Sequence, residues 1–441
     1  MKLLLPAILL GRLAAASPVS APVEERAEKF NYDGYRVLRV AFDEYEKNPE
    51  AVAALGEQLS DEPPQLGFVD LLVAPEKNSE VESLAINAQV IQDDLGAAIK
   101  QEEEETVEYR AGAVPSDSWF DAYHSYADHL AFLTDLVSVR PSNAEIVYAG
   151  TSSQGRNITG IHFWGSSGKN TKPAVIMHST VHAREWITTL TNEYVAYQLL
   201  TKYASDATIK SYVDKYDFYV FPVVNPDGTC ETFELVEDVT YDSAGFVYTQ
   251  TNTRLWRKNR QSVSSSTCIG TDINRNWAVG WNVAGGSSTD PCDETYRGTA
   301  ALSAPETSGL AAFSRTVASR QGVKMYMDWH SYSQLWMTPY GYTCSQLPST
   351  NAELQSISGG AVAAIEAVHG TQFEYGPICQ TIYQASGSSV DYSHQTVGSQ
   401  YTFTAELRDT GRYGFVLPAN QIRPTSEEMW AGMSYVFANM K

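Results

Sequence analysis

Four short, uninterrupted apolar segments, separated by stretches with helical spacing, decide the fold class of this chain. We identify them at Ala174–Met177, Phe218–Val224, Val323–Asp328 and Tyr401–Leu407. Strands that are apolar on both faces occur in sheets covered on both sides, which is typical of α/β proteins with parallel central strands. From about residue 115 onward we therefore predict an α/β fold: a mixed, centrally parallel sheet with helices on both faces.

A smaller unit is predicted before this sheet, between about residues 20 and 110. Its pattern has a βαββαβ-like order, with a strand at Arg36–Phe42, a helix at Asn48–Leu59, a strand at Gly67–Ala74, a helix from about Glu80, a short strand near Gln89–Asp93 and a helix into Gln101–Tyr109. The Glu102–Glu105 run is expected to be a solvated helix face and linker. Arg110, in the polar stretch that follows, offers a protease a point of entry.

The first residues are typical of a secretory signal, although an ordinary N-terminal helix is the alternative. Lys2 supplies a positive start, Leu3–Leu10 is an apolar run, and Ala14–Ser17 offers small residues for cleavage. We therefore expect a signal peptide at 1–18 and a secreted, extracellular protein. Export permits disulfides, and the chain has an odd number of cysteines: Cys230, Cys268, Cys292, Cys344 and Cys379.

The charge of the chain excludes one class of partner. The net charge of −21 argues against a nucleic-acid-binding protein, which needs a basic surface. After the N-terminus there is no apolar stretch of about 18 residues, so no transmembrane helix and no membrane partner are expected.

Three residues suggest a metal site. His182 and Glu185 form a His-x-x-Glu pair just after one apolar segment, and His330 follows another. Two imidazoles and one carboxylate are a ligand set of catalytic zinc, which keeps a position open for water. Open α/β sheets bind ligands at the carboxyl ends of their strands, so these residues are expected to converge. Taken alone, His182 is better interpreted as a hydrogen-bonded core histidine, and the other motifs are what favour a metal ligand.

A carboxylate in the last apolar segment has two interpretations. Glu406 is surrounded by apolar residues, and a buried carboxylate needs a partner. It either pairs with Arg408 or Arg412, or it acts as the general base that zinc-dependent hydrolysis requires.

A group of cations also has two interpretations. Arg254, Arg257 and Arg260 recur every third residue, which fits either a solvated basic helix face or a guanidinium directed at a developing oxyanion.

The segment around residue 272 adds polar groups. Asp272 is suited to accept the spare N–H of a zinc-bound histidine. Asn274 and Arg275 are a donor pair suited to a carboxylate, because arginine offers a bidentate fork.

Together these segments resemble the zinc metallocarboxypeptidases of the pancreatic carboxypeptidase A type. The motifs that carry the resemblance occur in the order of that family, from about residue 115 to the C-terminus: His182–Trp186, Asn225–Gly228, Leu255–Lys258, Asp272–Trp277, His330–Gln334, Ile382–Gly387 and Glu406–Gly414. The resemblance implies a carboxypeptidase-like catalytic domain at 113–441. It also implies that 19–112 is an activation propeptide with a ferredoxin-like α+β fold, removed by an activating protease.

The resemblance also implies a role for each candidate residue. One Zn²⁺ per chain would be held by His182, Glu185 and His330, with Asp272 orienting His182. Glu406 would be the base and Arg257 would polarise the scissile carbonyl. The substrate would be the C-terminus of a peptide or protein. Its terminal carboxylate would be bound by Asn274, Arg275 and Tyr383, and the residues further along the peptide by subsites that Arg184 and Tyr332 line. A monomer is expected.

Substrate preference and disulfides follow from the same resemblance. Val390 matches the floor of the pocket for the C-terminal side chain, and an apolar floor gives a buried cation no partner. Preference for aromatic and large aliphatic residues is therefore predicted, with Asp391 as the one acid close enough in sequence to alter it. The remaining wall would be formed by Met337, Ile378, Ile382, Ala385 and Thr404. The family suggests the disulfides Cys268–Cys292 and Cys344–Cys379, which leaves Cys230 unpaired.

One segment departs from the family pattern. Thr229–Gly245 separates two motifs that relatives join almost directly. It is either a surface loop, which chains tolerate well, or a retained short intron in the gene model. A second functional class, a relative that binds peptides or zinc without turnover, is disfavoured because no ligand or base is missing.

Overall fold

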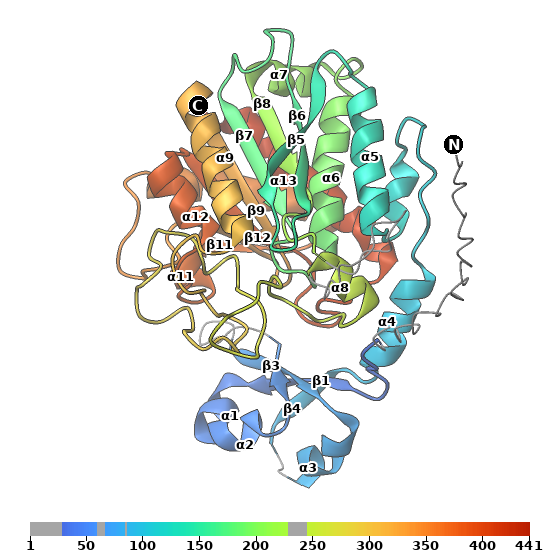
Figure 1. The fold of residues 1–441 in the computed structure, drawn as a ribbon, viewed down its shortest axis with the longest axis vertical. Coiled ribbons are helices and arrows are strands. Elements are labelled where there is room, and N and C mark those ends of the chain that lie inside the picture. The colour runs from blue at the N-terminus through green and yellow to red at the C-terminus, as the bar shows by residue number, and fades with distance from the viewer. Residues whose placement is uncertain (1–28, 60–66, 84–85, 228–244) are drawn as a thin grey trace, which may run out of the picture.

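The computed structural model describes residues 29–59, 67–83, 86–227 and 245–441. Within these residues the chain forms an eight-stranded sheet and a four-stranded sheet, and the smaller one lies at one end of the molecule (Figure 1). The expected signal peptide, 1–18, and almost all of the Thr229–Gly245 segment lie outside the described residues.

The larger sheet has the strand order β11-β10-β12-β9-β7-β8-β6-β5. Its four central strands β12, β9, β7 and β8 are parallel, and antiparallel pairs lie towards both edges. The bounds are β5 Ala144–Thr151, β6 Asn157–Phe163, β7 Ala174–Ser179, β8 Asp217–Phe221, β9 Val323–His330, β10 Leu335–Thr338, β11 Glu374–Pro377 and β12 Tyr401–Glu406. The predicted mixed, centrally parallel sheet is confirmed.

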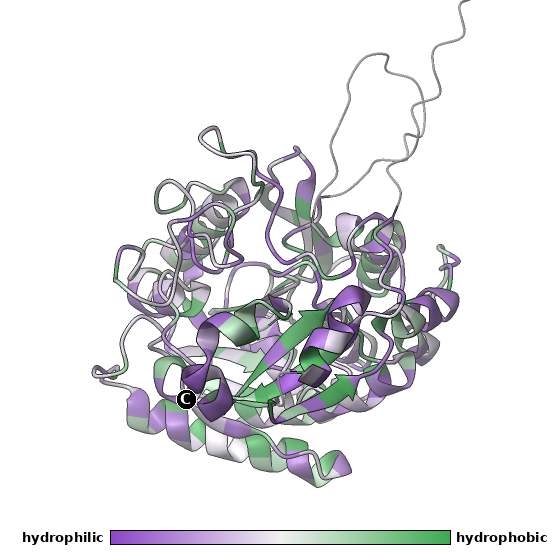
Figure 2. Ribbon diagram, turned by 90° about the horizontal axis from the view of Figure 1, so that it is seen from below, coloured by the Kyte–Doolittle hydropathy of each residue, from purple (hydrophilic) through white to green (hydrophobic). Residues whose placement is uncertain are grey.

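Helices cover both faces of this sheet. Because side chains alternate along a strand, Met327 and Trp329 of β9 join one core cluster and Tyr326 joins the other. The first cluster is closed by α5 Tyr126–Ser138, α6 Trp186–Thr201, α7 Ala207–Lys215, α10 Asn351–His369 and α13 Ile422–Asn439, and the second by α9 Pro305–Gln321 and α12 Ser389–Tyr392. Figure 2 shows the strands as mostly hydrophobic, whereas the helices alternate between hydrophobic and hydrophilic bands.

The smaller sheet is antiparallel, with the order β2-β3-β1-β4. Its elements follow one another as βαββαβ plus a final helix, which is the ferredoxin-like order: β1 Arg36–Ala41, α1 Phe42–Lys47, α2 Pro49–Ala53, β2 Glu57–Gln58, β3 Phe68–Val73, α3 Asn78–Ser83, β4 Ala88–Gln92 and α4 Leu95–Glu104.

Two predicted helices of this unit have different bounds in the structure. The helix expected at Asn48–Leu59 is two short helices that start at Phe42 and break before Pro49, and its last residues form β2 instead. The helix expected to run into Tyr109 ends at Glu104. The Glu102–Glu105 run is not wholly solvated, because the side chain of Glu102 is completely buried.

The two faces of the smaller sheet have different neighbours. Leu38 and Val40 of β1 pack against α1 and α2 in a core of the unit's own. The opposite face, with Val37 and Leu72, joins a cluster that includes Leu255 from the larger part of the chain. This second cluster is therefore shared between α4 of the smaller unit, through Leu95 and Ile99, and the larger part of the chain.

The four paired cysteines are as the resemblance implied. Cys268–Cys292 and Cys344–Cys379 form disulfides with Cα–Cα separations of 5.1 and 4.9 Å. Among the described residues no helix has both the length and the apolar character needed to cross a membrane.

Candidate active site

Three side chains converge where β7 and β9 end. His182 and Glu185 lie in the turn between β7 and α6, and His330 is the last residue of β9. Because β7 and β9 are parallel neighbours, their carboxyl ends lie at the same edge of the sheet. The topology therefore brings together residues that are about 150 positions apart in sequence.

The geometry of these three residues fits one metal ion. His182 Nδ1 lies 2.7 Å from Glu185 Oε1, and His330 Nδ1 lies 3.1 Å from Glu185 Oε2 and 3.1 Å from His182 Nδ1. Their potential ligand atoms all lie within 4.8 Å of one another, and the three residues are buried. This is the only such group of metal-ligating side chains among the residues that the structure describes.

The electrostatics of the site also favour a divalent cation. Burial raises the pKa of Glu185, but the imidazoles of His182 and His330 lower it well below its usual value. Four buried carboxyl groups lie with two guanidinium groups here: Glu185, Asp272, Asp328 and Glu406 with Arg257 and Arg275. The donor set is that of a zinc site.

Asp272 connects a ligand to the nearest arginine. Its Oδ1 lies 3.2 Å from His182 Nε2, and its Oδ2 accepts hydrogen bonds from Arg257 Nη2 at 2.8 Å and Nε at 3.2 Å. Burial raises the pKa of Asp272, but Arg257 and His182 outweigh it and the pKa is well below its usual value. This carboxylate is therefore ionised and orients both groups.

Of the two interpretations of the arginine group, the solvated basic helix face is wrong. The helix α8 Phe246–Thr251 ends before Arg254, and both Arg254 and Arg257 are buried. Arg257 lies beside the candidate ligands, whereas Arg254 forms a bidentate pair with Glu102 of the smaller unit, at 2.6 and 2.9 Å.

Glu406 is the last residue of β12 and lies opposite His330 in the parallel register of β12 and β9. Its alternative partner Arg408 binds Glu428 instead, with Nε 2.9 Å from the carboxylate. Burial raises the pKa of Glu406 well above its usual value. Glu406 lines one cavity with the candidate ligands His182 and Glu185, so the structure places this carboxylate at the candidate centre.

The residues expected to bind a carboxylate lie next to the centre. Asn274 Nδ2 lies 3.1 Å from His330 Nε2, and Arg275 Nη1 lies 4.0 Å from Asp272 Oδ2. The Tyr383 ring lies 5.7 Å from the Arg275 guanidinium carbon. All three were singled out from sequence, and the fold brings them to one side of the cluster.

A compact apolar cluster contains Val390 and adjoins Tyr383. Its buried members are Leu335, Met337, Ile378, Ile382, Ala385 and Val390. Asp391, the acid that follows Val390, accepts hydrogen bonds from the backbone N–H groups of Gly341 and Tyr342, each at 3.0 Å. Its carboxylate is thus already engaged by the backbone.

The cavity over the centre is closed by the smaller unit. It has a volume of about 40 Å³, and Leu59 and Phe68 line it together with His182 and Glu185. Arg184 Nη2 donates to the Leu59 carbonyl at 2.8 Å, and Tyr332 Oη donates to Asp70 Oδ2 at 2.8 Å. Both residues expected to line substrate subsites therefore contact the smaller unit.

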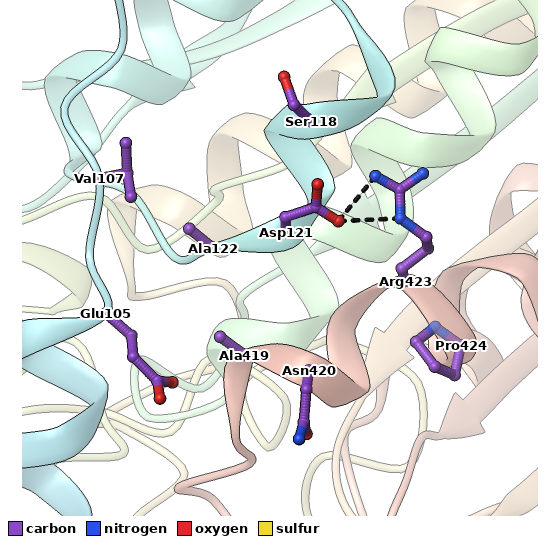
Figure 3. Close-up of a pocket in the computed structure, with 9 residues that line it drawn as sticks. All are labelled: Glu105, Val107, Ser118, Asp121, Ala122, Ala419, Asn420, Arg423 and Pro424. Atoms are coloured by element: carbon purple, nitrogen blue, oxygen red, sulfur yellow. Dashed lines mark hydrogen bonds and ion pairs between the residues drawn. The ribbon is translucent and has the colours of Figure 1, made fainter.

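A larger cavity lies elsewhere and lacks such chemistry. Its volume is about 740 Å³, and it lies between the end of α4 and the start of α13. Figure 3 shows that its charged pair, Arg423 and Asp121, is joined by hydrogen bonds of 2.7 and 2.9 Å. None of the candidate catalytic residues lines it.

Sequence reasoning missed two residues at the site. Asp328 lies 3.0 Å from His330 Nε2, and Asp70 reaches Tyr332 from the smaller unit. An available signal for Asp328 was its position in an apolar strand two residues before a ligand, which places both on one face.

Comparison with known proteins identifies relatives over most of the chain. Residues 129–432 match the family model described as zinc carboxypeptidase. The chain is 44% identical, over 100% of its length and 99% of the relative's, to a metallocarboxypeptidase A-like protein of Trichophyton verrucosum. It is 37% identical to carboxypeptidase A1 of Rattus norvegicus, over 79% and 77% of the two chains. The crystal structure of thrombin activatable fibrinolysis inhibitor matches with a TM-score of 0.79 and 27% identity, over 92% and 98% of the chains.

Proposed function

The chain belongs to the zinc carboxypeptidase family and is a zinc-dependent peptide hydrolase that acts on C-terminal residues; from this premise we propose that it is a secreted enzyme, made as an inactive precursor, that prefers aromatic and large aliphatic C-terminal residues. The observation that carries the proposal is the cavity in which two of the proposed metal ligands, His182 and Glu185, meet Glu406 and residues of the smaller unit.

The proposed ligands of the one zinc ion are His182, Glu185 and His330. When bound, zinc lowers the pKa of a water molecule and polarises the scissile carbonyl. Glu406 takes a proton from the attacking water and delivers it to the amine that leaves. Arg257, held by Asp272, faces the carbonyl oxygen as negative charge develops on it.

Exopeptidase action depends on the residues proposed to bind the terminal carboxylate of the substrate. Asn274, Arg275 and Tyr383 offer one guanidinium and neutral donors beside the centre, which suits the free carboxylate that ends a peptide. A chain that continued more than one residue beyond the scissile bond would place no carboxylate there, so only the last peptide bond is positioned for cleavage.

The preference for apolar residues is supported by the cluster around Val390. A C-terminal lysine or arginine in this cluster would be desolvated without an anion. Asp391 does not offer one, because two backbone N–H groups already bind its carboxylate, and burial raises its pKa to about 7.

The precursor state is supported by contacts over the cavity. Leu59 and Asp70 of the smaller unit occupy the hydrogen-bonding groups of Arg184 and Tyr332, so a peptide needs that unit to leave. An activating protease would cut the linker near Arg110, which is exposed. The proposed boundaries are 1–18 for the signal, 19–112 for the propeptide and 113–441 for the catalytic domain, which acts as a monomer.

One assay tests the proposal. The purified full chain is incubated with a trypsin-like protease, and release of Phe or Lys from blocked dipeptides is followed before and after cleavage. We expect Phe release only after cleavage, its loss with 1,10-phenanthroline and its return with Zn²⁺. Faster release of Lys refutes the preference, and equal activity before cleavage refutes the precursor state.

A further inference from the structure

A second buried aspartate lies behind the metal-ligand triad. Asp328 is two residues before His330 on β9, so both side chains lie on the same face of the strand. The β7–β9 register places His178 directly opposite Asp328. Asp328 Oδ1 lies 3.0 Å from His330 Nε2 and 3.5 Å from His178 Nε2, while Ser389 Oγ donates a hydrogen bond to Asp328 Oδ2.

We propose that Asp328 is the positioning residue of His330, as Asp272 is for His182, and that His178 and Ser389 hold Asp328 in place. The inference rests on the proposed ligand set. Asp328 touches neither substrate nor metal and acts through the imidazole of His330.

The tautomer of His330 supports this role. Its Nδ1 faces Glu185 and His182, so a metal ion held there leaves the ring proton on Nε2. A metal-bound histidine of fixed tautomer needs an acceptor for that N–H. Asp328 Oδ1 lies 3.0 Å away, at ion-pair distance, and has no hydrogen-bond partner among the described residues, so it is open to accept this N–H.

The other neighbour of His330 Nε2 cannot serve as the acceptor. Asn274 Nδ2 lies 3.1 Å away, but an amide nitrogen only donates. The amide oxygen of Asn274 is turned away and accepts a hydrogen bond from the backbone N–H of Ser389 at 3.0 Å. Asn274 therefore remains available to the substrate, and Asp328 is left to orient the ligand.

His178 completes this arrangement. It is buried, neither of its ring nitrogens has a hydrogen-bond partner within the described residues, and its ring packs 5.1 Å from that of Tyr326. With Nε2 facing Asp328 Oδ1 at 3.5 Å, the imidazole dipole offsets part of the negative charge of a fully buried carboxylate.

Zinc affinity tests the inference without relying on turnover. The dissociation constant of Zn²⁺ is measured on the full chain by competition with a chromophoric chelator. Asp328→Asn keeps the size of the side chain and removes its charge, and we expect zinc to bind about 10- to 100-fold more weakly. Unaltered zinc affinity in folded Asp328→Asn overturns the proposal.

Asp217→Asn is the matched control. Asp217 is also a fully buried aspartate facing a buried histidine, with its Oδ2 3.7 Å from His162 Nε2, but it begins β8 at the far end of the strands from the triad. Loss of this charge is expected to lower the melting temperature and to leave zinc affinity unchanged. Equal weakening in both variants shows a general effect of a buried charge and refutes the specific role.

Two further variants keep the test decisive. If Asp328→Asn does not fold, Ser389→Ala and His178→Phe each remove one support of Asp328, and we expect about 10-fold weaker zinc binding, at the low end of the range for such outer contacts. Wild-type affinity in both refutes the proposal. His330→Ala tests the ligand set separately: if zinc still binds as in the wild type, the proposed site is wrong, and not only the role of Asp328.

Discussion

The larger and the smaller sheet of this chain bury their faces in different ways. The larger sheet is covered on both sides by helices of its own part of the chain. The smaller sheet covers one face with α1 and α2, and on the other face α4 of its own unit shares the cluster with Leu255 and Val416 of the larger part. The difference indicates that the larger part can remain folded alone, whereas the second core of the smaller unit is completed by docking.

Buried charges show the same contrast. In the larger part, Asp272 and Arg257 neutralise each other within one domain. At the docking surface the partners come from different units: Glu102 meets Arg254, and Asp70 meets Tyr332. Arg39 lies opposite Asp70 in the β1–β3 register and reaches the Thr410 carbonyl at 2.6 Å. Buried charged groups within the larger part thus position the residues of the site, whereas those at the docking surface join the two units.

The largest expected effect concerns the larger part alone. Glu406→Gln, assayed after the linker has been cut, should lower kcat/KM for release of C-terminal Phe by about 10⁴-fold, because the general base is lost. Docking of the smaller unit should not change, since among the described residues Glu406 meets that unit only at the shared cavity. Activity within tenfold of the wild type would refute the assignment of the base.

Breaking the buried pair between the units should have the next largest effect. Glu102→Ala leaves the buried guanidinium of Arg254 without its carboxylate, which costs roughly 3–5 kcal/mol. This loss falls on docking, so the uncut chain should gain peptidase activity and show an earlier unfolding transition for the smaller unit. Activity of the uncut chain and calorimetry measure the two effects.

Glu103→Ala is the control for this prediction. Glu103 is the next residue of α4, but it pairs with Lys29 at the surface with 42% of its side chain exposed. Exposed pairs contribute less than about 1 kcal/mol, so the uncut chain should stay inactive. An inactive Glu102→Ala precursor would show that the apolar cluster around Leu255 alone holds the units together.

The same contrast explains what could be predicted from sequence. The central strands and the triad are local signals, because a continuous apolar run and a short motif each carry their meaning within a few residues. Glu102 could not be separated from the three acids that follow it, since only the docked Arg254 distinguishes them. The partner of a side chain across two units is a property of the tertiary structure.

Within the larger part, contacts between residues far apart in sequence could not be predicted from the sequence either. Asp328 was recognised as the end of an apolar strand, but its neighbours His178 and Ser389 come from β7 and α12. The alternative pairing of Glu406 with Arg408 was open in sequence, because the competing carboxylate Glu428 lies on α13. Family resemblance located the ligands, and only the fold showed what surrounds them.

A smaller effect should appear in the pH dependence of the stability of the larger part. Burial raises the pKa of Asp391 to about 7 from its usual value near 3.8. The folded state therefore binds a proton that the unfolded state has released, so the free energy of unfolding should fall as pH rises from about 4 to 7. Asp391→Asn should make the free energy of unfolding fall less steeply with pH. The slope should change by up to about 1.4 kcal/mol per pH unit, which is the contribution of one proton.

Urea unfolding of the cut enzyme at several pH values measures this slope. Because Asp391 binds only groups of the larger part, removing the smaller unit should leave its contribution unchanged. A variant with the wild-type slope would show that Asp391 remains ionised on the two backbone N–H groups.

The smallest expected effect lies in the linker between the two parts. Asp135 on α5 accepts hydrogen bonds from the Tyr109 hydroxyl at 3.0 Å and from the Gly112 N–H at 2.8 Å, and these two contacts bracket the exposed Arg110. A protease needs the linker extended, so these contacts must open first. Asp135→Ala removes both, and each hydrogen bond contributes about 1 kcal/mol, so cleavage near Arg110 should be about 5- to 30-fold faster.

Tyr109→Phe separates the two contacts. It removes one hydrogen bond and keeps the ring packed against Trp119, 4.8 Å away, so the cleavage rate should lie between those of the wild type and Asp135→Ala. Thr134→Ala, an exposed neighbour on α5, should be cut at the wild-type rate. Because cleavage follows the population of the open linker when opening and closing are fast, this series measures how firmly the larger part holds the segment that joins it to the smaller one.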